Sequence, residues 1–345
     1  MAEQPLDTEE TGTDLPEGLV PPDIDAPDGA NESDGLSPPP TVSASTARGG
    51  PVLLRERYFV DTANPLPEFD QPSAKAYAVE DRRDLSYKLF ALACTPGVPA
   101  RIDHIKTLKG QDHTGLLPLV EWDVVFWPPL GQGSLIVIYE RPLGGRVVDR
   151  LHKKEARITE YDVPRKVAEP LIEGLQTLNE SVGPHRAVRP NNLYFLDEDM
   201  EEIVLGPHVT SPPGFDQLAD FEPIDRAACQ PEGRGAGDIV DDIFALAVTI
   251  IHLVVGYNPV AKVKPEVLLL QRLEFGSYTA LCGNTRLPMA LIEPLRSMLI
   301  DDVSVRWNYN EVNNWVTGQK TNPVKKLPAR RSEVPFRFRK REHFT

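Results

Sequence analysis

The sequence of 345 residues predicts an α+β protein in which short strands precede longer helices. Between residues 51 and 141 apolar side chains gather in short runs, and between residues 142 and 317 they recur at helical spacing. Neither pattern continues into the two ends of the chain. We therefore expect a strand-rich part over residues 51–141 and a mainly helical part over residues 142–317, flanked by tails at 1–50 and 318–345.

Three stretches of the first part favour β-strands, because β-branched and aromatic residues fit a pleated, half-buried surface. Residues 52–60 form the first stretch, and residues 76–79 follow it after a Pro-rich loop. Residues 135–139 are an unbroken run of Leu, Ile, Val, Ile and Tyr and give the strongest signal. We expect these strands to belong to a small first lobe.

The pattern changes to helical after residues 142–145. One helical face carries Val167, Leu171, Leu175 and Leu178. Gly183 and Pro184 follow as a stop signal. Residues 241–255 are apolar nearly all round, which predicts a helix buried in the centre of the second lobe.

Composition and charge limit the classes of function. A hydrophobic fraction of 41% is ordinary for a folded protein, whereas 34 prolines exceed what a compact domain needs, so part of the chain should be unfolded. The formal net charge of -14 argues against general nucleic-acid binding, which requires a basic surface. Cys94, Cys229 and Cys282 are far apart and suggest neither a disulfide framework nor a zinc site.

Targeting signals are not evident. The sequence starts without a basic and apolar leader, and its longest apolar run, residues 243–255, is too short to span a bilayer. We therefore expect a cytoplasmic protein with no transmembrane segment.

The two tails differ in charge. Residues 1–50 are rich in Pro, Gly, Ser, Asp and Glu, and they predict a disordered acidic tail that is either a partner-binding arm or a solubilising extension. Residues 318–345 are basic and include Phe336, Phe338 and Phe344. This second tail could contact an anionic partner or surface, or it could be the linker of a longer protein.

Residues 185–192 read H-R-A-V-R-P-N-N. This segment resembles the catalytic loop H-R-D-x-x-x-x-N of protein kinases, in which the Asp accepts the substrate proton and the Asn holds magnesium. His185, Arg186 and Asn192 keep the pattern, but Ala187 stands where the catalytic aspartate would be and cannot accept a proton.

Further matches follow in the order found in kinases. Residues 140–149 resemble the hinge and its helix, and residues 230–232 resemble the A-P-E motif, ending in Glu232. Residues 242–247 resemble the D-x-W-S-L-G start of a buried helix, and residues 302–307 resemble the late segment that carries an arginine, here Arg306. The chain thus resembles a divergent bacterial member of the eukaryotic-type Ser/Thr protein kinase superfamily, which implies a two-lobed fold over about residues 52–317.

The resemblance implies structural roles for four residues. Glu232 and Arg306 would form an ion pair, and Asp242 would accept backbone N–H groups near His185. Asp242 could also cap the N-terminus of the buried helix. By the same resemblance, His185 packs and hydrogen-bonds internally and does not act as a base.

The catalytic positions of the resemblance are degenerate. The best match to the V-A-I-K strand, residues 76–80, ends in Glu80, and residues 61–67 contain no glycine that could bring the backbone close to phosphates. Pro207, His208 and Val209 stand in place of D-F-G. We therefore expect no catalytic residue and no cofactor. Mg-ATP would bind only if nucleotide binding is retained, with Asn192 as its one remaining ligand.

These losses predict a catalytically inactive pseudokinase that acts as a regulatory or scaffolding module and binds a protein partner. The alternative is an active ATP-dependent Ser/Thr protein kinase, or another nucleotide transferase, that uses non-standard residues. Six acidic residues are candidates for its base or metal ligand: Asp197, Glu198, Asp199, Glu201, Glu202 and Asp216.

Overall fold

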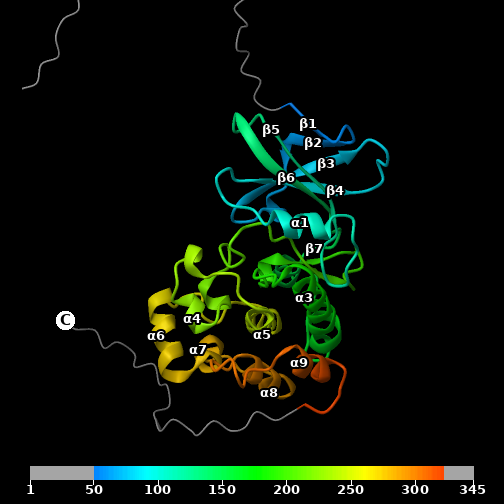
Figure 1. Ribbon diagram of the computed structural model, residues 1–345. Helices are drawn as coiled ribbons and strands as arrows, with labels where there is room; N and C mark the ends of the chain where they lie inside the picture. The colour runs from blue at the N-terminus through cyan, green and yellow to red at the C-terminus, as the bar shows by residue number, and fades with distance from the viewer. Residues whose placement is uncertain (1–49, 322–345) are drawn as a thin grey trace, which may run out of the picture. The chain divides into compact units, whose positions relative to one another are not determined.

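The computed structural model describes residues 50–321, so the expectations for residues 1–49 and 322–345 lie outside the described part of the chain. The described residues form an α+β protein, as the sequence predicted, in which the strands of the larger sheet precede most of the helices (Figure 1). Within residues 50–321 no helix combines the length and apolar character needed to cross a membrane.

The larger sheet has six antiparallel strands in the order β1-β2-β3-β4-β6-β5. Helix α1, Ile102–Leu108, lies between β4 and β5 in the chain. The strands are β1 Val52–Leu54, β2 Tyr58–Pro65, β3 Ala74–Asp81, β4 Leu89–Cys94, β5 Leu119–Trp127 and β6 Gln132–Glu140.

Strand β4 is the part of this sheet that the sequence pattern did not single out. All six of its side chains are buried, so it shows no polar alternation. It pairs with β3 on one side and with β6 on the other, and it is the strand that leads to α1. Glu80, which was expected at the V-A-I-K lysine position, lies exposed on β3 opposite Phe59 of β2. Its strand is separated from β6 by β4.

A second, three-stranded sheet joins β7 Gly145–Arg146, β8 Leu193–Phe195 and β9 Ile203–Leu205. The helices from this point on are α2 Val147–His152, α3 Glu169–Val182, α4 Ile224–Ala227, α5 Ile239–Val255, α6 Pro265–Phe275, α7 Ser277–Cys282, α8 Met289–Met298 and α9 Tyr309–Val316. The helical core that the sequence predicted gathers on α3 and α5, whose apolar side chains share one buried cluster.

Helix α5 is buried along nearly its whole length, as its apolar sequence predicted. Asp238 is its N-cap and forms a capping box with Asp241. The proposed N-cap role of Asp242 was therefore wrong, since that residue lies inside the first turn. Gly256 ends the helix with φ 77°, a left-handed conformation that favours glycine.

His252 in the last turn of α5 should make stability depend on pH. Its Nε2 has no hydrogen-bond partner within residues 50–321, and burial lowers its pKa to about 4. The unfolded chain, with a His pKa of about 6.5, binds the proton first, so this residue destabilises the fold as pH falls from about 6.5 towards 4.

We predict that His252→Leu flattens the pH dependence of the unfolding free energy between pH 6 and 5, by up to about 1.4 kcal/mol per pH unit. Urea unfolding at a series of pH values measures the slope. The exposed His152 provides the matched control, and His152→Leu should leave the slope unchanged. Equal slopes in the wild type and His252→Leu would contradict the prediction.

Candidate functional site

Residues 185–192 form a buried loop between α3 and β8, held by the carboxylate of Asp242 on α5. The two oxygens of Asp242 accept the backbone N–H groups of His185, at 2.7 Å, and Arg186, at 2.6 Å. These are the hydrogen bonds that the sequence predicted for Asp242. Burial raises the pKa of this carboxyl to about 7, although the Arg186 charge and the two N–H donors oppose the shift.

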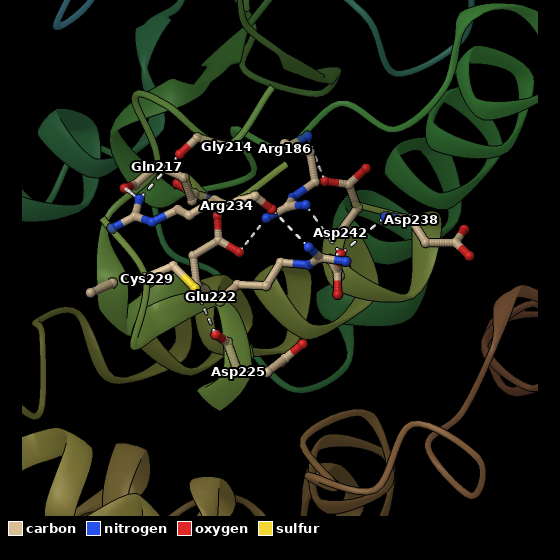
Figure 2. A network of polar contacts seen from close by, with 12 residues as sticks. Arg186, Gly214, Gln217, Glu222, Asp225, Cys229, Arg234, Asp238 and Asp242 are labelled. Carbon is tan, nitrogen blue, oxygen red and sulfur yellow. Dashed lines mark hydrogen bonds and ion pairs between the residues drawn. The ribbon is translucent and has the colours of Figure 1, made fainter. Parts of the chain in front are cut away.

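The side chain of Arg186 connects the loop to the first turn of α5 and to the segment before α4 (Figure 2). Its guanidinium donates to Glu222 and to Asp241, and all three side chains are buried. Arg226 also donates to Asp241, at 2.8 Å. Burial raises the pKa of Glu222, while the charge of Arg186 opposes that rise. A buried ion network of this kind is expensive to break at one member, so it holds the loop in one conformation.

Two histidines of the loop region are buried and neutral. Burial lowers the pKa of His185 to about 3 and that of His208 well below its usual value. His185 receives the N–H of Ala187 on Nδ1, so its Nε2 donates to the carbonyl of Gly206. Arg101 donates to Nδ1 of His208, whose Nε2 then donates to Thr210. Both rings therefore hold structure in place, as expected from the sequence for His185.

Asn192, the residue expected to retain metal binding, has its amide fully engaged by the protein. Its Nδ2 donates to the carbonyls of Ala187, at 3.1 Å, and Pro207, at 3.2 Å. Its Oδ1, the atom that would hold a metal, accepts a hydrogen bond from Nε2 of Gln71 at 3.0 Å. Asn192 is completely buried. Gly206 also packs tightly there, since a Cβ on Gly206 would lie 2.5 Å from Oδ1.

Gln71 connects Asn192 to a cation that the sequence reasoning did not select. Its Oε1 accepts from Nη2 of Arg189 at 2.9 Å, and Arg189 also donates to the carbonyl of Asp216. Burial lowers the pKa of Arg189 to about 10, so its guanidinium stays charged at neutral pH. Ser73 donates to the carboxylate of Asp216 at 2.6 Å and completes the group. We call Gln71, Ser73, Arg189, Asn192 and Asp216 the Asn192 cluster.

Phe69, two residues before Gln71, packs its aromatic ring between two elements of the protein. It stacks on Phe90 of β4 with ring centroids 4.8 Å apart and lies 5.6 Å from the ring of Tyr194 on β8. Phe69 is 2% exposed. The segment between β2 and β3, residues 66–73, thus inserts Phe69 and Gln71 between the larger sheet and the loop at residues 185–192.

This inserting segment was not identified from the sequence. The sequence distinguished residues 61–67 only by their lack of glycine, whereas Phe69 and Gln71, which make the contacts, follow just after them. An available signal was Phe69 as a lone aromatic residue in a Pro-rich loop, where a solvent-exposed turn would not need one. Arg189 lies inside the same loop, but it falls at a variable x position of the H-R-D-x-x-x-x-N pattern, which assigns it no role.

The structure gives different roles to two of the acidic candidates for an alternative base or metal ligand. Asp197 accepts the backbone N–H groups of Glu201 and Glu202 in the turn between β8 and β9. Asp216 is the candidate that joins the Asn192 cluster, where Ser73 occupies one of its oxygens. Within residues 50–321 no group of three His, Cys, Asp or Glu side chains is arranged to hold a metal ion.

The predicted ion pair between Glu232 and Arg306 is absent from the ion pairs of residues 50–321. Glu232 is exposed on a short turn, whereas Arg306 is buried. Arg306 donates to the carbonyl of Ile300 at 2.7 Å and lies 5.2 Å from the ring centre of Phe244. The buried ion pair near this segment is instead Arg186 with Glu222, ten residues before Glu232.

No protein-family model matches the chain, and no curated protein matches it either.

Asp242 and Glu232 should differ sharply when each is replaced by alanine. Asp242→Ala leaves two buried N–H groups without an acceptor, at about 1–3 kcal/mol each, so we predict a loss of about 2 kcal/mol or more in unfolding free energy. Glu232→Ala removes an exposed side chain and should change it by less than about 0.5 kcal/mol. Urea unfolding of both variants tests this, and equal losses would show that the loop does not depend on Asp242.

Proposed function

We propose that residues 51–317 form a two-lobed protein kinase-like domain, with a first lobe at 51–141 and a second at 142–317, that has lost phosphotransfer. The order of segments supports this fold. A buried sheet strand, β6, leads into a hinge-like stretch, a helix precedes the H-R-A loop, and Asp242 on the central helix accepts the backbone of that loop. In this proposal, strand β4 and helix α1 correspond to the lysine strand of a kinase and the helix that follows it.

The observation that carries the loss of catalysis is the insertion of residues 66–73. In a kinase, a glycine-rich loop between the first strands covers the phosphates of ATP, and the catalytic-loop Asn holds magnesium. Here the segment between β2 and β3 contributes Gln71, which takes the metal-binding oxygen of Asn192, and Phe69, which stacks between β4 and β8. The protein itself occupies the space where nucleotide and metal would bind.

Each catalytic group is also replaced by one without the needed chemistry. Ala187 and Pro207 stand at the positions of the base and of the D-F-G aspartate. Strand β4 reads Leu-Phe-Ala-Leu-Ala-Cys and offers no lysine for phosphates. Phosphoryl transfer depends mainly on electrostatic positioning by metal and lysine, so losing these groups removes most of the rate enhancement.

A regulatory or scaffolding role in the cytoplasm, through binding of a protein partner, follows as the function of such a domain. Helix α6 supports it, because Val267 and Leu270 are exposed on that helix although large apolar side chains are usually buried. The alternative, an active phosphotransferase with non-standard residues, would need Asp216 to give up Ser73 and Gln71 to leave Asn192.

Magnesium dependence distinguishes these two functions. We predict that Mg-ATP raises the melting temperature of the full-length protein no more than ATP with EDTA does, because the oxygen of Asn192 is buried and bonded to Gln71. Ligand at 100 times its dissociation constant would otherwise stabilise by about 2.7 kcal/mol. A magnesium-dependent rise would support the alternative, and transfer of labelled phosphate to a protein substrate would establish it.

A further inference from the structure

A pocket of about 490 Å³ lies beside the hinge-like stretch that follows β6. Three parts of the chain line it: the inserting segment at Glu68 and Phe69, Lys88 before β4, and residues 141–153. Its cationic side chains are Lys88, Arg141, Arg146, Arg150 and Lys153. Glu68 and Asp149 are the carboxylates among its lining residues. We call this the hinge pocket.

The positive charge of the hinge pocket is opposite to that of the chain, which carries a formal net charge of -14. Its five cations are opposed by two lining carboxylates and by Glu155, which pairs with Arg150, so an excess of positive charge remains in one concave place. Charges act on one another more strongly beside apolar walls, such as Phe69 and Pro142, than in open water. An anion bound in this pocket would therefore be attracted by the excess of positive charge.

Most of these cations keep capacity for a ligand. Arg141 lies 3.5 Å from a carboxylate oxygen of Glu68 and stacks 5.6 Å from the centre of the Phe69 ring. Arg146 is committed to the protein, because it donates to the carbonyl of Glu68, lies 6.0 Å from the ring centre of Tyr194 and has a buried Nε. The exposed Lys88 and Lys153 take part in none of the ion pairs of those residues.

Arg150 is the cation of the hinge pocket that the protein already uses. It forms an ion pair with Glu155 at 2.5 Å and donates to the carbonyl of Gly144 at 2.6 Å. These contacts fix one wall of the pocket.

We propose that the hinge pocket binds the phosphate groups of a ligand that carries at least two negative charges. One phosphate group carries a charge of about -1.5 to -2 at neutral pH, which matches the excess positive charge better than one carboxylate does. Arginine pairs with phosphate oxygens through two parallel N–H donors, and lysine adds mobile point charges at the rim. The volume suits a small ligand or one modified side chain.

This inference does not depend on the loss of phosphotransfer, because the hinge pocket uses no residue of the Asn192 cluster. Phosphate groups bound by lysine and arginine need no magnesium. Binding here therefore persists in EDTA, whereas a nucleotide held at Asn192 would require the metal.

Calorimetric titration of the full-length protein with inorganic pyrophosphate in EDTA tests the proposal. We expect the wild type to bind and the double variant Lys88→Gln, Lys153→Gln to bind at least about 10-fold more weakly. Both side chains are exposed, so their replacement should leave the fold intact. The matched control is Lys262→Gln, Arg286→Gln, which removes two exposed cations outside the pocket and should bind like the wild type.

A second titration identifies the source of the phosphate. A phosphoserine peptide that binds more tightly than pyrophosphate, and only in its phosphorylated form, indicates a phosphorylated protein. Tighter binding of pyrophosphate indicates a small phosphate compound. The proposal is overturned if the wild type does not bind pyrophosphate, or if the control variant loses as much affinity as the pocket variant.

Discussion

The carboxylate of Asp242 is the contact on which the centre of this protein depends. It accepts two backbone N–H groups of the loop at residues 185–192 while completely buried, at a place where unpaired N–H groups would be costly. Arg186 has φ 65°, a left-handed conformation that is strained for a residue with a side chain. The bonds to Asp242 hold that conformation, and it directs the guanidinium of Arg186 to Glu222 and Asp241 (Figure 2).

Once the loop is held, Asn192 and Arg189 contact residues 66–73, which supply a hydrogen-bond partner for both. Gln71 hydrogen-bonds to both, and Phe69, two residues earlier in the same segment, stacks on Phe90. A ligand that entered this space would have to displace a buried aromatic side chain, at about 1.5–3 kcal/mol, and two buried hydrogen bonds, at about 1 kcal/mol each. In the kinase-like domain that we propose, the loop at residues 185–192 would anchor a closed interior, which favours a binding role for the outer surface.

The sequence was sufficient for features with a local signal. The α+β class and the buried helix at residues 241–255 could be predicted from apolar periodicity, whereas the bonds of Asp242 were predicted only through the resemblance to kinases. The ion pair expected between Glu232 and Arg306 was wrong. Several carboxylates precede the central helix, and only the fold shows that Glu222 is the buried one and that it pairs with Arg186. Gln71 and Asn192 are 121 residues apart, so no local pattern could indicate their contact.

A double-mutant cycle on Gln71 and Asn192 tests most directly whether residues 66–73 occupy the metal-binding position expected at Asn192. The unfolding free energies of Gln71→Ala, Asn192→Ala and the double variant are compared with that of the wild type by urea unfolding. We predict that the losses are not additive, with a coupling of about 0.5–3 kcal/mol, because the two amides bond to each other while buried. Additive losses, within about 0.3–0.5 kcal/mol, would mean that Gln71 does not occupy the oxygen of Asn192.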